Sequence, residues 1–177
     1  MIELTHGKFP NVEYFDSKAA VEQYIRDLGV PATFFLAGFF MSNFPGASIC
    51  QLPPNNDWTM ALPMPPDTPI PCFDAAGDTG VFVKAILTHR DETLGKKVLG
   101  ATDYYTPQQI MANFQELYPE AGKSAKFIEI DEDAYKGALA NAGMPEKAQL
   151  VLYENMAFMH YYGYFGKASL AESHAVC

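Results

Sequence analysis

One continuous apolar run, ATFFLAGFF from Ala32 to Phe40, constrains the fold of this chain more than any other feature. An apolar run without polar alternation is typical of a strand that is covered on both faces, as in a parallel sheet. The segment before it predicts a helix capped by Asp16 or Ser17 and ended by Gly29. The apolar residues of that helix recur at helical spacing: Val21, Tyr24, Ile25 and Leu28. A helix followed at once by a buried strand predicts half of a βαβ unit, and therefore an α/β fold.

Further helices and strands alternate along the rest of the chain. The proline-rich segment 45–71 predicts an irregular hairpin excursion with little regular pairing. Helices are expected after Asp74 or Asp78, from Thr106, where Thr106, Pro107 and Gln109 match a capping box, and over Asp131–Asn141 and Pro145–Tyr162. Strands are expected in KKVLGATD and AKFIEI. We therefore predict a single domain over residues 1–177, with a short parallel sheet, flanking helices and the proline-rich excursion.

Composition and charge exclude several classes of function. The formal net charge of -9 and the pI near 4.8 leave no basic stripe for direct nucleic-acid binding. The longest apolar run, Ala32–Met41, is too short to span a membrane, and residues 1–6 lack the parts of a signal peptide. We therefore expect a soluble, cytoplasmic protein. Three cysteines without CxxC spacing predict reduced thiols (Cys50, Cys72 and Cys177), and the four scattered histidines predict no metal site.

An ordered set of motifs resembles one known family. FDSKAAVEQYIRDLGVPATFFLAGFFMSNF, ALPMPPDTPIPCFDAAGDTGVFVKAIL and GATDYYTPQQI are similar to segments of the NmrA-like family, atypical members of the short-chain dehydrogenase/reductase superfamily. The resemblance implies a Rossmann-like fold whose first half binds a dinucleotide through a glycine loop. No strand followed by such a loop occurs in these 177 residues, because Gly77 and Gly80 lack both the spacing and the strand. We therefore expect a truncated Rossmann-like fold and no cofactor.

The same resemblance assigns a cofactor-facing role to one segment and one lysine. Lys18 matches the family lysine beside the nicotinamide ribose, which takes part in proton transfer in the isoflavone-reductase relatives. Phe39, Phe40, Met41 and Ser42 match the segment that lines the nicotinamide end. The alternative for Lys18 is a solvated lysine in the first helical turn, where the helix dipole disfavours a cation slightly.

Without nicotinamide, the remaining chemistry would be acid–base chemistry. His160, Tyr161 and Tyr162 are candidates because histidine titrates near neutral pH, although His160 could equally be a surface residue that ends a helix. Asp103 follows a predicted strand, where α/β sites lie, or it is a turn residue that accepts hydrogen bonds from its own backbone. For Asp74 and Asp78 helix capping is the better explanation.

The aromatic content, 14% of the chain, fits a pocket for an apolar ligand as well as a core. The candidate substrate-binding residues are Phe39, Phe40, Met41, Trp58, Tyr104, Tyr105, Met156 and Met159. The function that we expect is a cofactor-independent isomerase, cyclase or dehydratase that acts on an apolar secondary metabolite. The alternative is an NmrA-like regulatory protein that senses NAD(P) and binds a transcription factor. An apolar strand with an unpaired edge also predicts a homodimer.

Overall fold

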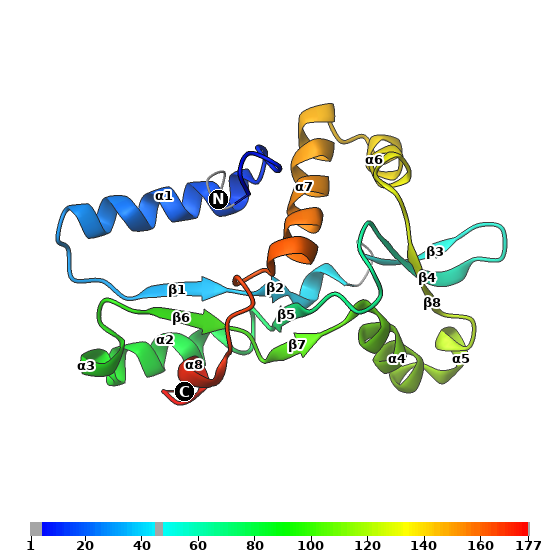
Figure 1. Cartoon of the computed structure of the whole chain (residues 1–177). Helices are drawn as coiled ribbons and strands as arrows, with labels where there is room; N and C mark the ends of the chain where they lie inside the picture. Colours follow the sequence, from blue (N-terminus) through cyan, green and yellow to red (C-terminus); the bar gives the residue numbers. More distant parts are fainter. Residues whose placement is uncertain (1–4, 45–47, 177) are drawn as a thin grey trace.

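The structure is a computed structural model, and it describes residues 5–44 and 48–176 (Figure 1). Its helices are α1 (Glu13–Asp27), η1 (Met41–Asn43), α2 (Thr79–Thr88), α3 (Arg90–Thr93), α4 (Pro107–Leu117), α5 (Pro119–Gly122), α6 (Glu132–Asn141), α7 (Glu146–Tyr162) and α8 (Ala171–His174). Its strands are β1 (Phe34–Ala37), β2 (Phe39–Phe40), β3 (Ile49–Leu52), β4 (Asp57–Leu62), β5 (Ile70–Phe73), β6 (Lys97–Gly100), β7 (Asp103–Tyr105) and β8 (Lys126–Glu129). Helices and strands alternate, so the predicted α/β class is confirmed.

The strands form small sheets in which parallel pairs predominate. β1 pairs with β6 in parallel, β2 joins the sheet β2-β5-β7, and β8 pairs in parallel with β4 beside the antiparallel β3–β4 hairpin. Figure 1 shows α1 along one face of the β1–β6 pair and α2, α3 and α8 toward the other. A short parallel sheet with flanking helices was the sequence prediction, and the structure agrees with it.

The apolar run is divided at Gly38 into two strands. A Cβ atom at this position would lie 2.5 Å from the Pro71 carbonyl oxygen and 3.1 Å from that of Gly100, so only glycine allows this approach. The Gly38 N–H donates to the Gly100 oxygen at 2.8 Å, and the chain then leaves β6 to pair with β5. The prediction of one strand covered on both faces is wrong, since Phe34–Ala37 is only half-buried.

Helix α1 begins earlier than the sequence indicated. It starts at Glu13 because Val12, which is fully buried against Phe9 and Phe158, anchors the chain there. Lys18 therefore lies in the second helical turn, and the unfavourable first-turn position expected for it does not exist. The expected apolar face is not covered either: Val21, Tyr24 and Leu28 are exposed in the described structure.

The proline-rich segment contains more regular pairing than expected. β3 and β4 pair along their whole lengths, from Ile49 opposite Met60 to Leu52 opposite Asp57. Most prolines of the segment lie outside the strands, in the hairpin tip at Pro53–Pro54 and between β4 and β5, where no ladder hydrogen bond is lost. Residues 45–47, at the start of the predicted excursion, lie outside the described residues.

The local helix signals agree with the structure in most places. Thr106 and Gln109 form the predicted capping box, with the Gln109 N–H donating to the Thr106 hydroxyl at 3.2 Å and the Thr106 N–H to the Gln109 side chain at 2.9 Å. The Asp131 carboxylate caps α6. Asp78 occupies the N-cap position of α2 without a capping side-chain bond, and it accepts instead from the Thr102 hydroxyl. Asp74 accepts from two backbone N–H groups in the preceding turn.

The main hydrophobic core lies between β4, β5, α4, α6 and α7. Met60, Met64 and Ile70 are fully buried in it, and Met159 of α7 packs beside them. None of the helices in residues 5–44 and 48–176 is long and apolar enough to cross a membrane. This core forms the base of the site that is described next.

Candidate functional site

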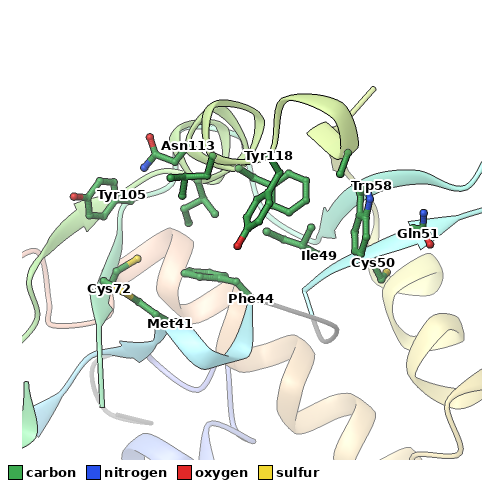
Figure 2. A pocket seen from close by; sticks show the side chains of 14 residues that line it. Met41, Phe44, Ile49, Cys50, Gln51, Trp58, Cys72, Tyr105, Asn113 and Tyr118 are labelled. Atoms are coloured by element: carbon green, nitrogen blue, oxygen red, sulfur yellow. The ribbon is translucent and has the colours of Figure 1, made fainter. Parts of the chain in front are cut away.

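A cavity of about 760 Å³ opens from the main core toward solvent, between α4, α5, the β3–β4 hairpin and η1 (Figure 2). Its lining comes from seven elements and from Phe44 and Tyr118, which lie directly after η1 and α4. The lining includes Met41, Phe44, Ile49, Cys50, Trp58, Cys72, Tyr105, Ile110, Asn113, Phe114, Leu117, Tyr118 and Ala121. The volume is that of a typical site for a small organic ligand.

Aromatic rings form the walls of the cavity. The Trp58 ring, from β4, lies 5.6 Å from the Phe114 ring of α4, and Phe114 lies 5.2 Å from Tyr118. Figure 2 shows the Tyr118 hydroxyl reaching down into the cavity toward Phe44. Such rings offer large, flat apolar surfaces at fixed positions, which suits an aromatic or alicyclic ligand.

The floor and the rim of the cavity differ in burial. Ile49, Cys72 and Ile110 form the floor and are buried as part of the main core. Leu117 and Tyr118, at the rim, are 73% and 57% exposed. The cavity is therefore an open-mouthed depression in the core, reached over two exposed apolar side chains.

Among the residues that the structure describes, the lining contains no aspartate, glutamate, lysine, arginine or histidine. Burial raises the pKa of the Cys72 thiol to about 12, and its Sγ donates a weak hydrogen bond to the Ile70 carbonyl at 3.6 Å. Cys72 is therefore a neutral thiol at physiological pH. Cys50 is a free thiol as well, whereas Cys177 lies outside the described residues. The polar groups that remain are amides and phenol hydroxyls, which bind and orient a neutral ligand.

Three predicted substrate-binding residues line this cavity, namely Met41, Trp58 and Tyr105. Phe39, Met156 and Met159 lie in the core beside it, and Phe39 stacks on Phe44 at 5.5 Å. The other two predicted substrate-binding residues lie outside this cavity. Phe40 packs on Phe73 at 6.2 Å, and the Tyr104 hydroxyl donates to the Ala168 carbonyl at 2.8 Å.

The structure does not bring the predicted catalytic residues together. His160 Nδ1 lies 3.2 Å from the Thr68 hydroxyl at the side of α7, while Lys18 is exposed on α1. Asp103 is exposed at the start of β7, and its carboxylate accepts from the N–H of the next residue at 2.7 Å. Asp103 also lines a separate small cavity of about 370 Å³ with Tyr104 and His174.

The two tyrosines that follow His160 make structural contacts. The Tyr161 ring lies beneath the Lys8 ammonium group at 3.7 Å, a cation–π contact at the surface. Tyr162 stacks on Phe158 at 5.5 Å and lies edge-on to Phe9 at 6.2 Å. Both rings therefore fix the N-terminal segment to α7.

Sequence reasoning missed several residues of the cavity. Phe44, Ile49, Asn113 and Tyr118 line it without having been candidates. Phe114 belongs to the apolar stripe of α4. In the sequence, a stripe of this kind looks the same whether it faces a packed core or an open cavity. The residues gather only because the hairpin folds over α4.

Part of the described structure suits the nicotinamide end of a dinucleotide. β1 and β6 are parallel, so the segment after β1 and the segment after β6 leave from the same edge, where α/β folds place their ligands. Phe40 is 43% exposed there and Ser42 is exposed. This arrangement offers an apolar ring surface beside a hydroxyl, which fits an aromatic amide.

Comparison with known proteins identifies a family that matches nearly the whole chain and relatives that match part of it. The model of the NmrA-like family matches residues 1–176. The nitrogen metabolite repression protein nmrA of Emericella nidulans is 30% identical over 114 residues, which make up 62% of this chain and 32% of that protein. The nitrogen metabolite repression protein nmr of Neurospora crassa is 30% identical over 105 residues, 56% of this chain and 22% of that protein.

Solved structures show the same fold. The crystal structure of Nmra, a negative transcriptional regulator, in complex with NAD has a TM-score of 0.66 at 20% identity, and the complex with NADP has the same values. Both cover 88% of this chain and 51% of that chain. Isoflavone reductase has a TM-score of 0.59 at 20% identity, covering 85% of this chain and 48% of its own. The chain thus spans about half of these structures and no more than a third of the curated relatives.

These comparisons correct the expectation of a protein without a cofactor. That expectation is wrong because the Nmra structures hold NAD in one case and NADP in the other. The expectation treated the absence of a glycine loop from the sequence as proof that the dinucleotide-binding site is lost. A chain that spans only about half of Nmra does not support that step.

Proposed function

The chain belongs to the NmrA-like family, and on this basis we propose that it is part of a regulatory protein that binds NAD or NADP and contacts a transcription factor. The relatives named above include a negative transcriptional regulator solved with each dinucleotide. Two curated relatives are nitrogen metabolite repression proteins. These names support regulation better than they support an enzyme of acid–base chemistry.

One structural observation favours binding over catalysis. Within the part of the chain that the structure describes, the large cavity has no charged or imidazole side chain in its lining. Lys18 and His160 are not lining residues, and Asp103 lies opposite Cys72 in the β5–β7 pair without lining the cavity. General acid–base catalysis needs a group that exchanges a proton near neutral pH within hydrogen-bonding distance of the substrate. The neutral Cys72 thiol does not meet that need.

The dinucleotide would contact this chain through its nicotinamide end. Phe40 would supply a ring surface and Ser42 a hydroxyl at the edge where β1 ends. Lys18 is an exposed cation on α1, the helix that lies over the β1–β6 pair. The nicotinamide ring is positively charged when oxidised and neutral when reduced. A regulator that distinguishes these two states reports the redox balance of the cell.

Isothermal titration of the chain with NAD, NADP and their reduced forms tests this proposal. We expect weak but saturable binding that Phe40→Ala reduces at least tenfold, because the ring surface that contacts the nicotinamide is lost. Val81→Ala is the matched control, since Val81 is 53% exposed on α2. An absence of heat with all four dinucleotides would overturn the proposal, and equal loss in both variants would argue against this binding edge.

A second measurement separates a regulator from a reductase. We expect the reduced dinucleotides to bind without being consumed when the chain is incubated with them and a panel of quinones and enones. Steady oxidation of the reduced dinucleotide, stoichiometric with reduction of one panel compound, would favour an enzyme instead.

A further inference from the structure

We propose that the cavity between α4 and the β3–β4 hairpin is a binding site for a neutral, planar, apolar small molecule, separate from the dinucleotide. This ligand would bind in addition to the dinucleotide of the proposed function, and the inference does not depend on that proposed function. Its evidence is the charge, the shape and the position of the lining residues.

The electrostatics of the cavity select against charged ligands. The chain carries a formal net charge of -9, yet the described lining of the cavity holds no ionised side chain. An anionic ligand would lose its hydration at this site without gaining a cationic partner, and a cation would gain no carboxylate. A neutral molecule avoids both penalties.

The geometry of the walls selects for flat rings. Trp58 and Phe114 are tilted by 52° at 5.6 Å, and Phe114 and Tyr118 by 42° at 5.2 Å, so the three rings form a curved aromatic wall. Phe44 faces this wall across the open space in Figure 2. A planar ligand inserted between them would contact aromatic surface on both sides.

Two polar groups set the functionality that such a ligand can carry. The Tyr118 hydroxyl reaches toward the middle of the cavity, and Asn113 stands at its edge, on α4 (Figure 2). Each group can donate and accept a hydrogen bond. The ligand class is therefore an aromatic or polycyclic molecule with one or two hydroxyl, carbonyl or amine groups.

The chain provides its own reporter for this site, because Trp58 is its only tryptophan. We would titrate the protein with N-phenyl-1-naphthylamine, a neutral planar fluorophore that accepts energy from tryptophan. The matched probe is 1-anilinonaphthalene-8-sulfonate, which has the same ring system with one added sulfonate. We expect saturable quenching of Trp58 by the neutral probe, and at least tenfold weaker binding of the anionic one.

A pair of charge variants places the probe in the cavity. Leu117→Lys adds a cation at the rim, where the side chain is 73% exposed, and we expect it to reverse or erase the preference for the neutral probe. Leu87→Lys on α2, where the side chain is 70% exposed, is the control and should leave the preference unchanged. Both positions are open to solvent, so neither variant buries a charge.

A second pair tests the space itself. Ala121→Phe adds a ring to a lining residue that is exposed at the mouth, and we expect at least tenfold weaker binding of the neutral probe. Ala138→Phe on the exposed side of α6 is the control. Circular dichroism and the unfolding midpoint verify that all four variants are folded.

Three results would overturn this inference. The first is a lack of saturable Trp58 quenching, the second is equal affinity for the two probes, and the third is unchanged binding in Ala121→Phe. Saturating NAD or NADP should leave the affinity for the neutral probe unchanged. Competitive displacement of the probe by a dinucleotide would instead show that this cavity is part of the dinucleotide site. That result would overturn the inference of a separate site while leaving the proposed function intact.

Discussion

The Trp58 ring of β4 and the Phe114 ring of α4 lie 5.6 Å apart with their planes inclined by 52°. The contact joins the proline-rich segment to the capped helix that begins after Thr106. It holds the hairpin over α4, and the open space beside it is the cavity. Both the stability of this region and its ligand binding should therefore depend on this pair.

Phe114→Ala should lower the free energy of unfolding by roughly 2 kcal/mol, because a half-buried ring loses its apolar contacts with Trp58 and Tyr118. Urea denaturation followed by Trp58 emission measures the change. Leu117→Ala, one turn along the same helix but 73% exposed, is the control and should change stability by less than about 0.5 kcal/mol. Equal effects of the two variants would contradict the packing described here.

Glu154→Gln should destabilise the protein by about 1–3 kcal/mol. The buried Glu154 carboxylate accepts from the Asn11 backbone N–H at 2.6 Å and from the Asn11 side chain at 2.7 Å. Glutamine removes the charge and presents an amide group to one of these donors. Thermal unfolding measures the loss, with Glu146→Gln at the exposed start of α7 as control. An unchanged midpoint in Glu154→Gln would show that this link does not hold the N-terminal segment.

Stability should fall above pH 9 because of Cys72. Burial raises the pKa of its thiol to about 12 in the folded state, from the 9.0 of an unperturbed thiol. The contribution of the buried Cys72 thiol to stability is therefore fully present below pH 9, where the thiol keeps its proton in both the folded and the unfolded state. It is lost as the pH rises from 9 toward 12, because the unfolded chain then releases the proton first.

Denaturation of the wild type and of Cys72→Ala at about pH 8 and about pH 10.5 measures this effect. The wild type should lose about 2 kcal/mol more than the variant over this interval, at 1.36 kcal/mol per pKa unit. Burial also raises the pKa of Tyr135 to about 12, but both proteins share that group, so the difference reports Cys72. Parallel losses in the two proteins would contradict the assignment.

The sequence predicted a homodimer from the open edge of its apolar strand, and we now propose that the chain self-associates through α1. Tyr14, Val21, Tyr24 and Leu28 form a stripe along this helix, and each is more than half exposed. Within the described residues, β1 pairs with β6 on one side only. An exposed stripe with heptad-like spacing beside an open strand edge is suited to pairing with another helix.

Light scattering after size-exclusion chromatography tests this prediction. We expect a dimer that the double variant Val21→Glu, Leu28→Glu converts to a monomer with little change in the unfolding midpoint, because both side chains are exposed. Leu87→Glu, on α2, is the control and should remain dimeric. A monomeric wild type at high micromolar concentration would refute self-association of this chain.

The elements that the sequence predicted well are those with local causes. The capping box of Thr106 and Gln109 and the Asp131 cap each act within three residues, so their helices could be located from composition and spacing. α7 matched its predicted range for the same reason, since Pro145 precedes it and Gly163 follows it. Hydrogen bonds between near neighbours form in the same way wherever the helix is later packed.

The errors arose where distant residues decide the outcome. The apolar run is divided at Gly38 because of contacts with Pro71 and Gly100, and neither is near it in the sequence. The beginning of α1 depends on the burial of Val12 against Phe158 of α7. The expectation of no cofactor failed differently, because it treated a motif that is missing from part of a fold as a missing site.

The amino-acid sequence by itself determined the α/β order of elements, the helix termini with local caps and the membership of a family. Only the tertiary structure decided which aromatic side chains would enclose space and which would fill it. Trp58 and Phe114 could be recognised as apolar from the sequence, but a cavity exists only where their elements meet without complete packing. Whether such a cavity forms depends on contacts between residues that are distant in the sequence. The spacing of residues along one helix or strand does not predict those contacts.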